Sequence, residues 1–153
     1  HDENSWNKAD FGVFPGAAHA PFAVFTQTME KSVPLIYGGQ EEPVLKPLEF
    51  FEKDPMDLGK FQRAGFYKTL LNLRKKSPAL SVDASFRKVV VGDEKTLYAF
   101  VRQKAGNKIF VILNLSNNEQ TIIVKDKTLL GNPYNVFMGN KETLSSRPWK
   151  IEP

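Results

Sequence analysis

The spacing of apolar residues changes near residue 80, and this change constrains the fold of the 153-residue chain more than any other feature. From Ser81 onward, short alternating segments are separated by turn residues, which is typical of antiparallel strands. The residues Lys104-Ala105-Gly106-Asn107 join two of these segments and favour a hairpin. The pattern predicts a small antiparallel β-sandwich, with strands in FRKVVVG, LYAFVRQ, KIFVILNLS, QTIIV, YNVFMG and RPWKIE.

The first 80 residues predict a helix, a short strand and a second helix. PFAVFTQTME predicts a helix that starts near Pro21, with Phe22, Phe25 and Met29 on one face. Leu35-Ile36-Tyr37, between Pro34 and a glycine pair, predicts a buried strand of a parallel sheet. A second helix is expected over residues 58–76, ended by Pro78. A single parallel strand has no partner for its backbone, so this part of the fold looks incomplete.

Composition excludes several classes of function. The hydrophobic share of 41% can supply a core, whereas no apolar run is long enough to span a membrane. The chain has no cysteine and only two histidines, so thiolate and histidine-rich metal sites are excluded. The net charge of +4 is dispersed, and its densest cluster, Arg74-Lys75-Lys76, falls where a helix should end. We therefore expect no nucleic-acid partner and no membrane partner.

Four motifs, in order along nearly the whole chain, carry a resemblance to a known family. Residues 32–41, SVPLIYGGQE, resemble the eighth-strand segment of the α-amylase family of glycoside hydrolases, Gly-x-Pro-x-Ile-Tyr-x-Gly-x-Glu, except that Ser32 replaces its first glycine. FFEKDPMD resembles the loop that follows this strand in the family, and LLNLRKKSPAL resembles its last barrel helix. KIFVILNLS is similar to the central strand of the β-sandwich that follows the barrel.

The same resemblance gives a role to the first residues of the chain. The family has an Asn-His-Asp or Ser-His-Asp motif after its seventh strand, and His1-Asp2 precede the eighth-strand segment at a matching distance. The resemblance implies that Asp2 is the carboxylate that stabilises the transition state and that His1 hydrogen-bonds the bound sugar. Trp6 either stacks on a sugar ring or packs its own loop. The resemblance also implies structural roles at the barrel rim for Tyr37 and Glu41.

The implied fold class is α+β: a remnant of the end of a (β/α)8 barrel over residues 1–80, followed by a small antiparallel β-sandwich over residues 81–153. Retaining cleavage of a glycosidic bond needs a nucleophile and a proton donor about 5 Å apart. In the family these groups come from the fourth and fifth barrel strands. We therefore expect a parent enzyme that acts on α-glucosidic bonds of starch-like glucans, and an inactive fragment. The fragment needs no cofactor, and the resemblance allows calcium in the parent.

Two alternatives from other classes remain open: a carbohydrate-binding module and a purely structural domain that braces a barrel. Several residues have simpler interpretations. Glu41 and Glu42 should point in opposite directions and form no catalytic pair. Asp54 and Asp57 could share a helical turn, but Asp54 is expected to cap a turn. Three further expectations concern other parts of the chain: His19 as a surface or helix-cap residue, the Asn114-Leu115-Ser116 sequon as unused within a strand, and Tyr134 and Trp149 as core anchors.

A barrel remnant should also expose apolar surface that its neighbours would otherwise cover. Such surface tends to be buried by self-association or by packing onto the chain's own sandwich. We therefore expect either an oligomer or a remnant packed on the sandwich. The apolar residues in question are Phe22, Phe25, Leu35, Ile36, Phe66 and Leu70.

Overall fold

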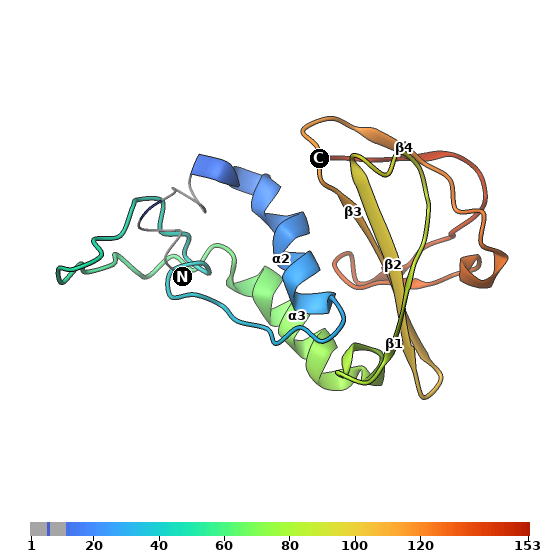
Figure 1. Cartoon of the computed structure of the whole chain (residues 1–153), viewed down its shortest axis with the longest axis horizontal. Helices are drawn as coiled ribbons and strands as arrows, with labels where there is room; N and C mark the ends of the chain where they lie inside the picture. Colours follow the sequence, from blue (N-terminus) through green and yellow to red (C-terminus); the bar gives the residue numbers. More distant parts are fainter. Residues whose placement is uncertain (1–5, 7–11) are drawn as a thin grey trace.

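A computed structural model describes Trp6 and residues 12–153 (Figure 1). Two helices, α2 (His19–Thr28) and α3 (Ala64–Lys76), lie beside a three-stranded antiparallel sheet of β1 (Ser85–Lys88), β2 (Leu97–Lys104) and β3 (Asn107–Asn114). Two further strand pairs are β4 (Gln120–Ile122) with β7 (Trp149–Ile151), and β5 (Tyr134–Asn135) with β6 (Asn140–Lys141). Short 3-10 turns complete the chain: η2 (Gly16–Ala18), η3 (Pro78–Leu80) and η4 (Lys127–Leu129).

Both predicted helices are present, with different starting points. Helix α2 begins at His19, two residues before the predicted start. Helix α3 begins at Ala64 rather than at residue 58 and ends at Lys76, ahead of Pro78 as expected. The late start has a local cause, because Gly59 and Phe61 have φ angles of 154° and 46°, outside the right-handed helical region. Neither helix is long and apolar enough to cross a membrane, and the same holds for every other helix among the described residues.

The predicted strand at Leu35-Ile36-Tyr37 is not formed. Residues 32–37 have no assigned secondary structure, and Leu35 is 73% exposed. A parallel strand needs a neighbouring strand for its backbone N–H and C=O groups, and none of the described strands pairs with this segment. The prediction of a buried strand was therefore wrong.

The strands after residue 80 are antiparallel, as predicted. All six predicted segments contain a strand, and β5 pairs with β6, which the sequence pattern did not predict. The predicted hairpin joins β2 to β3, with Lys104 opposite Asn107. Its two loop residues, Ala105 and Gly106, have φ angles of 49° and 78°, as a two-residue turn of type I′ requires. Strand order differs from a regular two-sheet sandwich, since the strands form one three-stranded sheet and two separate pairs.

Strand β2 is buried on both faces of the sheet. Successive side chains alternate between faces, so Leu97, Ala99 and Val101 point into a core that includes residues of β4 and β7. Tyr98 and Phe100 belong to a second core on the other face, where Phe25 of α2 packs against Tyr98 with ring centroids 5.7 Å apart. Helix α2 therefore packs on the face of the sheet opposite the core that includes residues of β4 and β7, and α3 lies beside α2 (Figure 1).

This packing bears on the expected exposure of the helices. Leu70 of α3 is buried, and Phe22, Phe25, Ile36 and Phe66 are half-buried, whereas Leu35 remains exposed. Phe25 of α2 packs on the face of the sheet that carries Tyr98, in line with the alternative that the helical part packs on the chain's own strands. Self-association of the chain stays a prediction.

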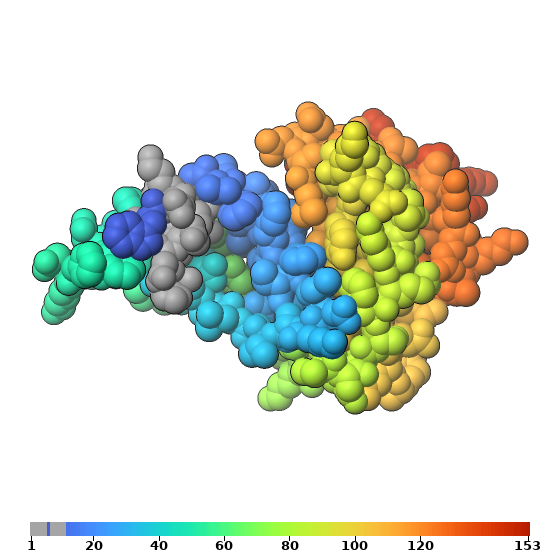
Figure 2. Space-filling model, in the orientation of Figure 1, coloured from blue at the N-terminus to red at the C-terminus, as the bar shows by residue number. Residues whose placement is uncertain are grey.

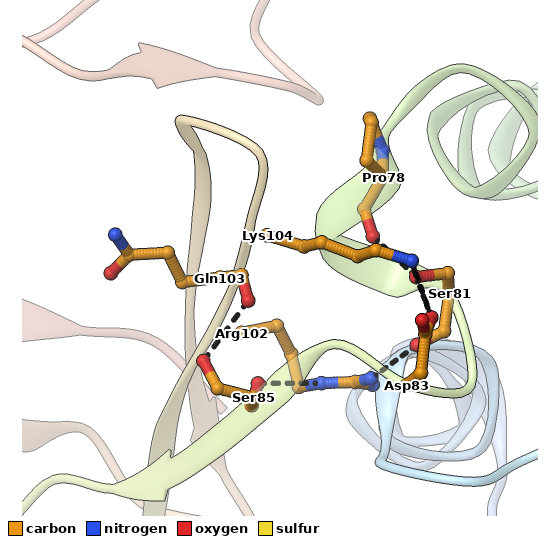
Figure 3. Close-up of polar contacts among 7 residues, drawn as sticks. All are labelled: Pro78, Ser81, Asp83, Ser85, Arg102, Gln103 and Lys104. Carbon is orange, nitrogen blue, oxygen red and sulfur yellow. Dashed lines mark hydrogen bonds and ion pairs between the residues drawn. The ribbon is translucent and has the colours of Figure 1, made fainter.

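Arg102 of β2 is fully buried and has no carboxylate among its hydrogen-bond partners in the described part of the chain. Its guanidinium donates to the carbonyl oxygens of Thr28 at 2.9 Å and Met29 at 3.0 Å, at the C-terminal end of α2. It also donates to the carbonyls of Ser81 at 2.8 Å and Ser85 at 3.2 Å (Figure 3). Burial lowers the pKa of Arg102 from its usual range, and the nearby Arg74 adds to this effect. One side chain thus joins the helical part, the connecting segment and the sheet.

A second arginine, Arg74 of α3, binds the same end of α2. Its guanidinium donates to the carbonyl of Gln27 at 3.0 Å and to the backbone oxygen of Ser32. The last carbonyls of a helix have no partner within the helix and lie at the negative end of its dipole, so cations are favoured there. Arg74 and Arg102 satisfy this end of α2 from two different elements.

Replacement of Arg102 by methionine should destabilise the fold strongly. R102M replaces the guanidinium with an unbranched apolar side chain and leaves four carbonyls without their donor. We therefore expect the free energy of unfolding to fall by at least about 3 kcal/mol. Urea unfolding followed by circular dichroism measures this change. R147M is the matched control because Arg147 is exposed, and its stability should stay within about 0.5 kcal/mol of the parent chain. Equal stability of R102M and R147M would contradict the role given to Arg102.

Candidate functional site

The residues with predicted catalytic and sugar-binding roles, His1 and Asp2, lie outside the described residues. Trp6, the third member of this predicted group, is described and lies on the surface with 59% of its area exposed. Its indole ring contacts Phe50, with the ring centroids 4.8 Å apart. The candidate site is therefore built from Trp6 and from the segment 33–63, which contains the eighth-strand motif and the loop after it.

The glycine pair of the motif forms a tight turn after Tyr37. The backbone N–H of Tyr37 donates to Gln40 Oε1 at 2.8 Å, and the N–H of Val44 donates to the carbonyl of Gly39 at 2.8 Å. Gly39 has a φ of 92°, and a Cβ at this position would lie 2.7 Å from a methyl carbon of Val44. Only glycine fits this position, so the glycine of the motif is explained by the geometry of the turn.

Glu42 is the acid that organises this segment. Its buried carboxylate accepts hydrogen bonds from the backbone N–H groups of Gly59 at 3.0 Å, Lys60 at 3.1 Å and Phe61 at 2.9 Å. The bonds from Phe61 and Gly59 lower the pKa of Glu42 below its ordinary value, so the group is ionised at neutral pH. A carboxylate in this state stabilises the loop ahead of α3 and is unsuited to donate a proton.

The neighbouring residues of the motif have less direct contacts. The backbone of Glu41 accepts a hydrogen bond from the N–H of Arg63 at 2.9 Å, and the backbone carbonyl of Glu42 accepts one from Gln62 at 3.0 Å. The rim roles predicted for Tyr37 and Glu41 stay predictions. Sequence reasoning missed Glu42, because its three N–H partners lie 17 to 19 positions further along the chain and no local spacing marks them.

Asp54 closes the loop that precedes α3. Its carboxylate accepts from Lys46 Nζ and from the backbone N–H of Glu49, the latter at 3.0 Å. The hydrogen bond from Lys46, followed by the one from Glu49, lowers the pKa of Asp54. Asp54 therefore fixes the ends of the segment 46–54 rather than sharing a helical turn with Asp57, since α3 begins only at Ala64.

Several predictions made outside this segment need correction. His19 is buried at the start of α2, with its ring 5.3 Å from that of Phe66, so the expected surface position is wrong. Tyr134 and Trp149 are 61% and 39% exposed, so neither is the predicted core anchor. The reason is that β5 and β7 belong to two-stranded pairs, which cover less surface than a full sheet.

The side chain of Asn114, the acceptor residue of the sequon, makes hydrogen bonds within the fold. The buried amide nitrogen of Asn114 donates to the carbonyls of Asn118 at 2.8 Å and Glu152 at 3.1 Å. This nitrogen is the atom that a glycan would need, and it fastens the segment after β7 instead. Strand β3 ends at Asn114, so Leu115 and Ser116 lie outside the strand in which the whole sequon was predicted to lie.

No group of three or more histidine, aspartate or glutamate residues in the described part of the chain is arranged to hold a metal ion. The acids with resolved roles, Glu42 and Asp54, are engaged with backbone N–H groups or a lysine. The described residues thus supply a tight turn at Gly39, a carboxylate bound by three backbone N–H groups, and an exposed aromatic surface.

Comparison with known proteins places the fold. No family model matches the sequence, and no curated protein matches it either. Among solved structures, a noncanonic maltogenic α-amylase, AmyB, from Thermotoga neapolitana is similar over 88% of this chain and 34% of its own, with a TM-score of 0.71 and 16% identity. An α-amylase from Lactobacillus plantarum is similar over 86% of this chain and 31% of its own, with a TM-score of 0.57 and 17% identity.

These likenesses establish the fold. The assembly of two helices and small antiparallel sheets has the architecture of the C-terminal region of an α-amylase, which confirms at the level of the fold the resemblance inferred from the four motifs. The chain spans about a third of the length of each of the two enzymes. The barrel remnant and the boundary near residue 80 stay predictions.

Neutralisation of Glu42 should loosen the start of α3 in a pH-dependent way. E42Q removes the charge that the three N–H groups bind, so its urea midpoint at pH 7 should lie below that of the parent chain. A carboxyl whose pKa is lowered on folding stabilises above its ordinary pKa, and this contribution disappears as the pH falls through the lowered value. The difference in urea midpoint between the two proteins should therefore narrow below about pH 4.5, the ordinary pKa of this carboxyl group.

E52Q is the control for this measurement, because Glu52 is exposed in the same loop region. Its midpoint should equal that of the parent chain at pH 7. A difference between E42Q and the parent chain that stays constant from pH 7 to pH 3 would contradict the role of the ionised carboxylate.

Proposed function

We propose that these residues form the C-terminal part of an α-amylase-like glycoside hydrolase that acts on α-glucosidic bonds of starch-like glucans. The observation that carries the proposal is the likeness of the fold to the maltogenic α-amylase, which spans 88% of this chain. Two thirds of that enzyme have no counterpart in these residues. The parent protein would supply the nucleophile and the proton donor of a retaining mechanism, about 5 Å apart across the scissile bond.

In this proposal each part of the chain has a defined task. Asp2 stabilises the positive charge that develops on the sugar ring, as a fixed carboxylate does in a site with little water. His1 hydrogen-bonds the sugar. The turn at Gly39 and the hydrogen bonds from three backbone N–H groups to the Glu42 carboxylate hold the loop after the eighth-strand segment against the start of α3. Without the other two carboxylates, the 153 residues alone should not cleave glycosidic bonds.

A second candidate is a carbohydrate-binding module, and one observation favours it. Tyr134 and Trp149 present exposed aromatic surface on the strand-rich part of the chain, where core residues were expected. Exposed aromatic rings are suited to stacking on sugars. A purely structural domain predicts no sugar binding at all.

The coding sequence upstream of His1 tests the proposal directly. We expect the reading frame to continue into a strand-rich barrel segment, with an aspartate and a glutamate at the ends of two strands. In the enzyme so defined, D2N should lower kcat on maltoheptaose by about 10²- to 10³-fold with a smaller effect on KM, because the lost interaction forms mainly in the transition state.

D57N provides the control, since Asp57 is exposed and has no role in the proposed chemistry. Its kcat should match that of the parent enzyme. An upstream region without a barrel, or a D2N enzyme with full activity, would contradict the proposal.

A further inference from the structure

We propose that residues 131–144 form a strap that fixes the direction of the helix pair, α2 and α3, relative to the sheet. The strap belongs to the strand-rich part of the chain and contacts α3 through Phe137. The ring of Phe137 stacks on that of Phe66, with centroids 5.4 Å apart and 10° between the ring planes. Phe66 lies in the first turn of α3, so the strap holds the end of the helix pair opposite to the one bound by Arg102.

The contacts of Arg102 and Arg74 lie at the other end of the pair. Both guanidinium groups donate to carbonyls at the C-terminal end of α2. The two helices also start side by side, since the ring of His19, the first residue of α2, is 5.3 Å from that of Phe66. Phe66 precedes Arg74 by eight positions, which corresponds to about 12 Å along the helix axis. Helices held at one end alone can rotate about that end, whereas a second contact at the other end fixes their direction.

The strap is a continuous antiparallel hairpin. Gly131 and Leu144 exchange two backbone hydrogen bonds of 3.0 and 2.8 Å at its base, and the N–H of Glu142 donates to the carbonyl of Pro133 at 3.0 Å. Strands β5 and β6 continue this ladder toward the tip. At the base, Leu144 and the preceding Leu130 pack against the core that includes residues of β4 and β7. The strap thus joins that core to the start of α3, and Figure 1 shows it, in orange-red, turning back toward the helices.

Asn135 shapes the tip of the strap. Its Oδ1 accepts hydrogen bonds from the N–H groups of Phe137 and Met138, both at 3.1 Å, and its backbone carbonyl accepts one from Gly139 at 2.9 Å. These bonds fix the backbone that carries Phe137, which lowers the conformational entropy lost when its ring stacks on Phe66. Asn135 is therefore a positioning residue for the strap.

The direction of the helix pair matters most for the segment that contains the candidate site. Figure 2 shows residues 46–54, in teal, at the end of the molecule away from the sheets. The carboxylate of Glu42 binds the N–H groups just ahead of α3 and so ties this segment to the helix. A rotation about the contacts of Arg102 would displace the far end of the molecule most. The strap therefore holds the candidate site in place relative to the strand-rich part.

Distances between two spin labels test the strap. The chain has no cysteine, so K68C/K125C places one label on α3 and one on the strand-rich part, both at exposed positions. Pulsed electron paramagnetic resonance should give one narrow distance distribution for this labelled parent. F137A should lose the narrow distribution, because the helix pair can then rotate about its other end. M138A is the matched control, since Met138 is 70% exposed on the same tip, and it should keep the narrow distribution.

Two variants of Asn135 test its positioning role. N135A should lose the narrow distribution as F137A does, whereas N135D should keep it, because aspartate retains an oxygen that accepts from the same two N–H groups. All these variants should keep the far-ultraviolet circular dichroism of the labelled parent, so that a change in distance reports a change in direction rather than unfolding. A narrow distribution in N135A would reject the role of Asn135.

A double-mutant cycle measures the ring contact itself. F66A and F137A should be coupled by about 2- to 12-fold in the equilibrium constant for urea unfolding, the range expected for a stacked aromatic pair. F66A and M138A should show no coupling. The strap is rejected by a narrow distribution in F137A, by an equally broad distribution in M138A, or by additive effects of F66A and F137A.

Discussion

The fold depends on one buried cation, the guanidinium of Arg102. It projects from β2 on the face of the sheet that carries Tyr98 and Phe100. It donates to the carbonyls of Thr28 and Met29 at the end of α2, of Ser81 in the segment between α3 and β1, and of Ser85 at the start of β1. A buried charge is costly unless its hydrogen-bonding capacity is filled. Here the carbonyl oxygens at the end of a helix, which also need partners, meet that requirement. Residues on one face of β2 thus bind α2 in two ways. Tyr98 and Phe100 belong to the core against which α2 packs, and Arg102 donates hydrogen bonds to the carbonyls at the end of the helix.

From this anchor a series of contacts leads to the candidate site. Gln27, next to the end of α2, donates from its side chain to the carbonyl of Leu35 at 3.3 Å and so directs the chain toward the motif segment. The turn at Gly39 then brings the Glu42 carboxylate to the N–H groups ahead of α3. Arg74 of α3 donates a hydrogen bond to the carbonyl of Gln27 in α2. The aromatic loop closed by Asp54 projects from this framework. The site is therefore supported by the same contacts that hold the helices to the sheet.

The sequence predicted the elements whose signals are local. The hairpin between β2 and β3 follows from alternation and from Gly106, and the end of α3 follows from Pro78 and the basic last turn. Predictions from the sequence were wrong or missing where the structure of a residue depends on a partner far away in the chain. Leu35 to Tyr37 have the composition of a buried strand, but no described strand pairs with them. No local pattern predicts the roles of Arg102 and Glu42, since their partners lie 17 to 74 positions away in the chain.

The contacts of Arg102 should make the helical part and the sheet unfold as one cooperative unit. Native-state hydrogen exchange measures this most directly, because it gives a free energy of opening for each amide. We expect the slowest amides of α2, α3 and β2 to share a single free energy of opening, equal to that of global unfolding. Amides of α2 and α3 that open at a clearly lower free energy than those of β2, with the sheet still protected, would contradict it.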